Sequence, residues 1–187
     1  QTRCHEKTFQ NIKYNLIDRL KADLCLCVGE DLSASITSFH KIVKYNFTIT
    51  EPDDWGKTCD FMYDKIVSKY PDRTNFTPWR DLLKIGNQWL GGFPDKHQHD
   101  GSAGILIFFR WFLMEMINKH NLTELYDRFI ITRSDYIYTL PHPSLEYLNK
   151  DYIWMPYGEQ YGGYTDRHVV ISNKDIISYL NIFETIL

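Results

Sequence analysis

Residues 8–28 read TFQNIKYNLIDRLKADLCLCV, and this stretch decides the fold class. Over 8–21 its apolar side chains recur at the three- and four-residue spacing of an amphipathic helix, with Thr8 as the expected N-cap. An apolar run over 22–28 follows at once and predicts a buried strand. A helix that leads directly into a buried strand is typical of α/β domains with a parallel sheet.

The rest of the chain continues this alternation. Further helices are expected over 32–45, 58–70, 103–120 and 173–187, and further strands over 47–50, 128–132, 136–138, 152–156 and 168–172. The stretch 71–101 follows neither period and contains prolines, glycines and tryptophans, which is typical of a lid or binding loop. We therefore expect an α/β fold with a mostly parallel, Rossmann-like central sheet flanked by helices, in a single domain over 1–187.

Composition and charge exclude several classes of protein. The 187 residues carry 21 Lys and Arg against 24 Asp and Glu, a formal net charge of −3, so a nucleic-acid partner is not expected. No apolar run approaches about 18 residues, so no membrane-spanning helix is expected. The four cysteines are scattered, which favours buried free thiols in the reducing cytoplasm. Because the chain begins at Gln1, we expect it to be a fragment of a longer chain.

The triplet Arg133-Ser134-Asp135 follows the strand expected over 128–132. In open α/β sheets, ligands bind beyond the carboxyl ends of the strands. A carboxylate at this point is therefore placed where a divalent cation would meet a diphosphate. The alternative is an aspartate that only caps a turn, and the triplet alone is compatible with both interpretations.

Three segments resemble GT-A-type glycosyltransferases. Residues 126–135 (YDRFIITRSD) are similar to the part of these enzymes in which a buried strand runs into a DxD motif. Residues 154–167 (WMPYGEQYGGYTDR) are similar to their acidic, glycine-containing loop, and Gln1-Thr2-Arg3 resembles the turn after their first strand. The resemblance is to enzymes of lipopolysaccharide synthesis and of large DNA viruses, among them chlorella-virus enzymes that glycosylate the capsid protein.

This resemblance implies a metal-dependent transferase that moves a sugar from a nucleotide sugar, a UDP-sugar, to a glycan or glycoprotein such as a viral capsid protein. Asp135 would bind Mn²⁺ or Mg²⁺, while Arg133, which replaces the first acid of the DxD motif, would take part of the diphosphate charge during catalysis. Asp166, with Glu159 as the alternative, would be the catalytic carboxylate. Donor-binding residues are implied at Gln1, Thr2, Arg3, Gly29, Glu30, Asp31, Asp100 and Ser134, and His168 is expected near the same cleft.

Two other interpretations stay open. A non-catalytic module that binds sugars or nucleotide sugars is compatible with the missing first acid of the DxD motif. A nucleotidyltransferase or phosphoesterase would share the cation and phosphate chemistry, but a two-metal site of that kind needs several converging carboxylates. The expected location is the cytoplasm, which would be the host cytoplasm for a viral chain.

Overall fold

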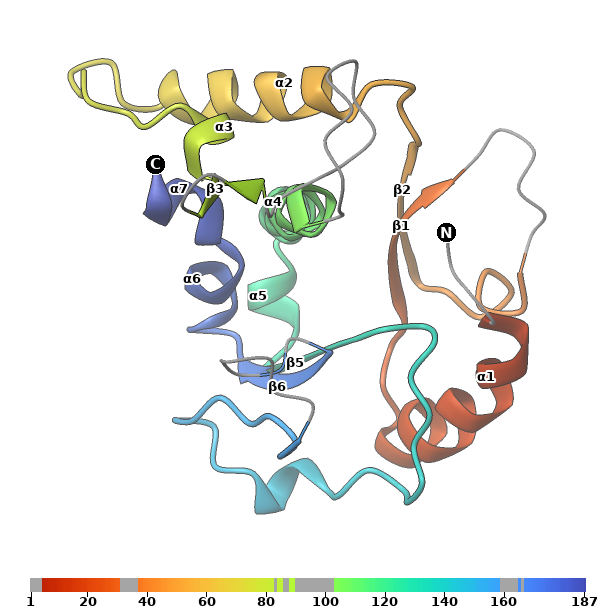
Figure 1. Ribbon diagram of the computed structural model, residues 1–187. Coiled ribbons are helices and arrows are strands. Elements are labelled where there is room, and N and C mark those ends of the chain that lie inside the picture. Colours follow the sequence, from red (N-terminus) through yellow and green to blue (C-terminus); the bar gives the residue numbers. More distant parts are fainter. Residues whose placement is uncertain are drawn as a thin grey trace. The chain divides into compact units, whose positions relative to one another are not determined.

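The computed structural model describes residues 5–30, 37–82, 84–85, 88–89, 103–158, 165 and 167–187 (Figure 1). The fold is mixed α/β, and the chain divides into two compact units. The first unit consists of Gln1–Ile49 with His120–Ile176, and the second of Thr50–Lys119 with Ile177–Leu187. The single domain expected over 1–187 stays a prediction.

The first unit begins with helix α1 (His5–Ile12), which continues as the π-helical segment η1 (Lys13–Asp18). Thr8 lies within α1, so its predicted role as N-cap is wrong. The helix ends at Lys21, whose φ of +52° is left-handed, and the next N–H, that of Ala22, donates to the Ile17 carbonyl at 2.9 Å. This hydrogen bond satisfies one of the last carbonyls of the helix.

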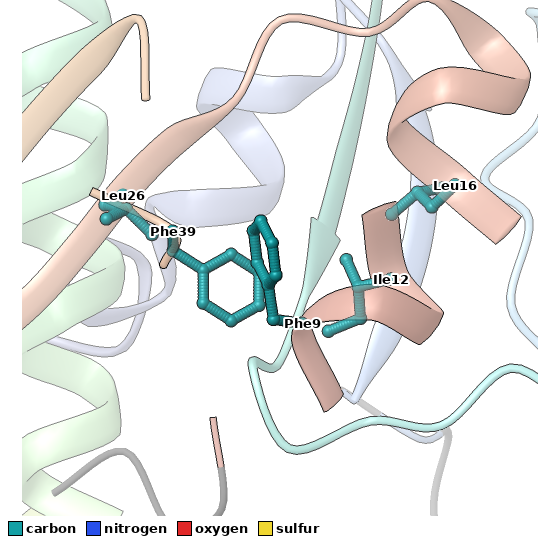
Figure 2. Close-up of a cluster of buried hydrophobic side chains, with 5 residues drawn as sticks. All are labelled: Phe9, Ile12, Leu16, Leu26 and Phe39. Carbon is teal, nitrogen blue, oxygen red and sulfur yellow. The ribbon is translucent and has the colours of Figure 1, made fainter. Parts of the chain in front are cut away.

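A buried hydrophobic cluster fixes this helix in the first unit. It consists of Phe9, Ile12, Leu16, Leu26 and Phe39 (Figure 2). The rings of Phe9 and Phe39 meet edge to face with centroids 5.0 Å apart, which is a preferred aromatic geometry. The three helical members are spaced three and four residues apart, so they share one face of the helix.

Two pairs of strands belong to the first unit. Strands β1 (Cys25–Glu30) and β2 (Tyr45–Thr50) are parallel, and the N–H groups of Lys44 and Tyr45 donate to the Leu24 carbonyl where the pair begins. Strands β5 (Arg128–Thr132) and β6 (His168–Ser172) are antiparallel, with Thr132 opposite His168 and Arg128 opposite Ser172. The residues of β6 are buried throughout.

The large, mostly parallel sheet that the sequence predicted is absent from the described residues. Their named strands form one parallel pair and two antiparallel pairs. The strands over 128–132 and 168–172 were predicted with their observed bounds, but a short buried apolar run has the same composition in either direction of pairing. Residues 136–138 and 152–156 are not strands, apart from a bridge between Trp154 and Val170.

Other short elements of this unit are α5 (Leu122–Leu125) and the 3₁₀ turn η2 (Leu145–Tyr147), and α6 (Ile176–Leu180) begins in it. Residues 37–44, expected as part of a helix, form turns. The expected helix over 173–187 is in fact two short helices, α6 and α7 (Ile182–Ile186), that are separated at Asn181.

The second unit is mainly helical. It contains α2 (Trp55–Val67), α3 (Trp79–Leu82), β3 (Lys84–Ile85), β4 (Gln88–Trp89), α4 (Ala103–Lys119) and α7. Helices α2 and α4 pack together, with the rings of Trp55 and Phe108 5.5 Å apart. Trp79 is buried and its Nε1 donates to Asp60 Oδ1 at 2.8 Å, so this tryptophan is a core residue. No helix in the described ranges is long and apolar enough to cross a membrane.

Candidate functional site at the end of strand β5

The structure describes only some of the site residues that the sequence predicted. Arg133, Ser134 and Asp135 follow β5, and His168 opens β6. Gly29 and Glu30 end β1, in the other strand pair of this unit. Seven predicted residues lie outside the described ones: Gln1, Thr2, Arg3, Asp31, Asp100, Glu159 and Asp166.

Arg133, Ser134 and Asp135 form a turn at the carboxyl end of β5, which we call the strand-end turn. Within it, Nε and Nη2 of Arg133 donate to Oδ1 and Oδ2 of Asp135 at 2.8 and 2.7 Å. This two-pronged geometry is the one in which a guanidinium binds a carboxylate or a phosphate most strongly.

A second arginine stands at the same edge of the strand pair. Because Thr132 is opposite His168 in an antiparallel register, Arg133 leaves β5 where Arg167 enters β6. Hydrogen bonds from Arg133, with a smaller electrostatic contribution from Arg167, hold the pKa of Asp135 below its usual range. At neutral pH Asp135 is therefore ionised, with the guanidinium of Arg133 bound to it and that of Arg167 near enough to stabilise its charge.

Helix α1 holds the strand-end turn and the chain that follows it. The buried Thr8 hydroxyl donates to the Ser134 carbonyl oxygen. Asn11 makes two hydrogen bonds to the backbone of Tyr138, accepting from its N–H at 2.7 Å and donating to its carbonyl at 2.9 Å. The His142 N–H donates to the Asn15 carbonyl at 2.8 Å. The spacing of Thr8, Asn11 and Asn15 places them on one face of the helix.

A polar cluster that the sequence did not predict lies beside the strand-end turn. We call it the Tyr138–His168 cluster; its members are Thr132, Tyr136, Tyr138, His142 and His168. The Tyr138 hydroxyl lies 3.1 Å from Thr132 Oγ1 and 3.0 Å from His168 Nδ1. The ring of Tyr136 stacks on that of His168 with centroids 5.9 Å apart. Of its members only His168 was expected near this site; for the tyrosines the signal in the sequence is the alternation Tyr136-Ile137-Tyr138, which puts both on one side of an extended chain.

Burial keeps both histidines of this cluster neutral. It lowers the pKa of His168 to about 4, with a further electrostatic contribution from His142, and burial also lowers the pKa of His142. His142 Nδ1 lies 2.8 Å from the Pro143 carbonyl oxygen and must therefore carry the proton, because a carbonyl oxygen only accepts. The cluster thus supports the adjacent turn without contributing charge to it.

The donor set at the strand-end turn suits a cation that arrives with its ligand. Among the described residues, no three His, Cys, Asp or Glu side chains are grouped as metal ligands. Each oxygen of Asp135 accepts one hydrogen bond from Arg133, and a carboxylate oxygen can accept a second contact. Mg²⁺ in particular is often held by one or two carboxylates together with substrate phosphates and water. Asp135 fits such a role better than that of a resident metal site.

Comparison with protein-family models finds none that matches the chain, and neither curated proteins nor solved structures match it. The function is therefore inferred from the residues and geometry of the chain itself.

Proposed function

We propose that the chain is a glycosyltransferase domain of GT-A type that takes a sugar from a nucleotide sugar, a UDP-sugar, and moves it to a glycan or glycoprotein acceptor. The observation that carries this proposal is the pair of arginines, Arg133 and Arg167, beside Asp135 at the carboxyl end of the half-buried strand β5. Guanidinium groups bind phosphate oxygens in two-pronged geometry, so two arginines at one place suit the diphosphate of such a donor.

Arg133 has the geometry and exposure to bind that diphosphate. Half of its side chain (52%) is exposed to solvent, while its Nε and Nη2 atoms already form a two-pronged contact. When the bond to the sugar breaks, negative charge develops on the departing nucleoside diphosphate. A guanidinium fixed at that point stabilises the charge without having to reorganise.

Asp135 is the residue that would hold Mn²⁺ or Mg²⁺. Such a cation neutralises part of the charge of the leaving diphosphate. Asp166, or Glu159 in its place, is proposed as the carboxylate that faces the sugar and the acceptor hydroxyl. The hydrogen bonds of Thr8 and Asn11 to the backbone of 134–138 hold the strand-end turn in one conformation, which favours a preorganised site.

A non-catalytic nucleotide-sugar-binding module is the second candidate. The observation that favours it is that Arg133 occupies the position of the first DxD acid and pairs with the remaining acid, Asp135. Both candidates predict donor binding at the strand-end turn, and only the first predicts cleavage of the donor.

The test is calorimetric titration of UDP and UDP-glucose, with Mn²⁺ or with EDTA, into the wild type and Asp135→Asn. Asp127→Asn, which removes an exposed carboxylate of the same unit, is the matched control. We expect binding that requires Mn²⁺, is lost in Asp135→Asn and is kept in the control. Slow release of UDP from UDP-glucose would then favour the transferase over the module. Absence of UDP binding under every condition would refute the UDP-sugar transferase and leave a module that binds sugars or another nucleotide sugar.

A further inference from the structure

A groove lies in the first unit, beside the helix that holds the strand-end turn. It has a volume of about 360 Å³ and is formed by α1, η1 and the turn over 38–42. Thr8, Asn11 and Asn15 contact the chain over 134–142. Gln10, Lys13 and Tyr14 line the groove instead. The two sets share no residue, so the groove is distinct from the candidate donor site.

The helix is irregular where it lines the groove. The segment η1 (Lys13–Asp18) is π-helical, and it contributes Lys13, Tyr14 and Asp18 to the groove. π-Helical turns within α-helices are rare and occur often at functional sites. Neither Gly nor Pro is present in η1, so no helix-breaking residue explains the irregularity.

The groove offers apolar and aromatic surface to a ring. Phe9, part of the buried cluster of Figure 2, lines it from α1. Ile42 and Tyr14 line it as well, and Tyr14 is 71% exposed. An exposed tyrosine beside a concave surface can stack on a planar ring or on the apolar face of a sugar, at small entropic cost because its side chain has two torsions.

The charge of the groove selects an anion. Two lysines, Lys13 and Lys41, line it together with a single carboxylate, Asp18. Lys13 Nζ donates to Asp18 Oδ2 at 2.5 Å, so these two charges compensate each other. Among the described residues that line the groove, Lys41 of the turn over 38–42 adds a positive charge that Asp18 does not compensate. The amide of Gln10 adds a hydrogen-bonding group at the same rim.

We propose that this groove binds a small phosphorylated ring compound of the size of a mononucleotide, with its phosphate at Lys41 and its ring against Tyr14 and Phe9. The volume lies at the lower end of the range of about 300–1,000 Å³ that is typical of small-molecule sites. A single excess positive charge matches a phosphate monoester better than a larger polyanion. This site is independent of donor binding at the strand-end turn.

The experiment is a titration followed by amide NMR shifts, with AMP, ribose 5-phosphate, adenosine and inorganic phosphate as probes. Lys41→Gln and Tyr14→Ala change exposed side chains and are expected to fold normally, which circular dichroism verifies. Lys57→Gln, an exposed lysine of helix α2, is the matched control, and Arg133→Gln reports on the strand-end turn.

We expect AMP to shift the amide signals of residues 9–18 and 38–42. Adenosine lacks the phosphate and inorganic phosphate lacks the ring, so each should bind more weakly than AMP by about tenfold or more. Lys41→Gln and Tyr14→Ala should weaken AMP binding, whereas Lys57→Gln and Arg133→Gln should leave it unchanged. Equal AMP binding by the wild type and Lys41→Gln would overturn the proposal. It would also be overturned by binding that Arg133→Gln abolishes, or by phosphate that binds as tightly as AMP.

Discussion

Arg133 binds both carboxylate oxygens of Asp135, with Nε 2.8 Å from Oδ1 and Nη2 2.7 Å from Oδ2. The two residues are separated by Ser134 alone, whose carbonyl oxygen accepts a hydrogen bond from Thr8 of helix α1. The pair is therefore fixed to the core of its unit even though both side chains are partly exposed. The position of the Arg133 guanidinium is therefore fixed by its own carboxylate partner and by helix α1.

Replacing Arg133 should change the ionisation of Asp135. In Arg133→Gln the pKa of Asp135 is expected to rise towards its ordinary value, because the hydrogen bonds from Arg133 are the largest cause of its lowering. NMR titration of the side-chain carboxyl carbon measures this pKa directly. Arg19→Gln removes an exposed arginine of the same unit and should leave the titration of Asp135 unchanged. An unaltered pKa in Arg133→Gln would contradict the role given to this pair.

The hydroxyl of Tyr138 should contribute to stability. Tyr138→Phe leaves Thr132 Oγ1 and His168 Nδ1 without the group that joins them, at an expected cost of about 1–3 kcal/mol in the free energy of unfolding. Tyr147→Phe, which alters a tyrosine that is largely exposed, is the control and should cost almost nothing. Urea unfolding of both variants measures the difference. Equal stability of the two would show that the bridging hydroxyl is dispensable.

Acid should destabilise the first unit through His168. Its pKa is about 4 in the folded chain against an ordinary 6.5, so protons bind the unfolded chain more readily. Stability is then fully present above about pH 6.5, falls as the pH drops, and reaches its full loss, up to about 3 kcal/mol, below about pH 4. His142 acts in the same direction, and among the described residues the other groups that face His168 are Tyr136, Tyr138 and, opposite it in the strand pair, Thr132.

The measurement is urea unfolding at several pH values, followed by the NMR signals of first-unit residues. Stability of His168→Gln should be lower than that of the wild type at pH 7 but should depend less on pH between 6.5 and 4. The same dependence on pH in both proteins would assign the acid sensitivity to other groups.

Asp54 should stabilise helix α2 of the second unit. Its side chain accepts hydrogen bonds from the backbone N–H groups of Gly56 and Lys57, so Asp54→Ala is expected to cost about 0.5–2 kcal/mol in the free energy of unfolding. Asp53→Ala removes the neighbouring carboxylate, which is exposed and precedes the cap, and serves as the control. Thermal unfolding followed by circular dichroism compares the two. A larger effect of Asp53→Ala would contradict the assignment of the cap.

Local patterns in the sequence predicted the elements that depend on them. The apolar spacing over 8–21 and the buried runs over 128–132 and 168–172 correspond to the helix α1–η1 and to β5 and β6. The direction in which β5 and β6 pair was not predictable, because it depends on contacts between residues about 40 apart in the chain. The break at Asn181 was missed because the amphipathic pattern continues across it.

The residues of the candidate site also differ in whether local sequence could identify them. Arg133 and Asp135 were identified because a polar triplet follows an apolar strand. Thr8 and Asn11 were not, since a polar residue within an amphipathic helix carries no sign of the distant backbone that it holds. Asn11 and Tyr138 are separated by 127 positions in the sequence.

The central claim is that the strand-end turn binds a diphosphate through its arginines, and the affinity for UDP of Arg133→Gln against Arg19→Gln tests it most directly. In the presence of Mn²⁺ we expect the wild type and Arg19→Gln to bind UDP equally, and Arg133→Gln to bind at least about tenfold more weakly, because a charged hydrogen-bonding pair is lost. Equal binding of UDP by all three proteins, or binding by none, would contradict the claim.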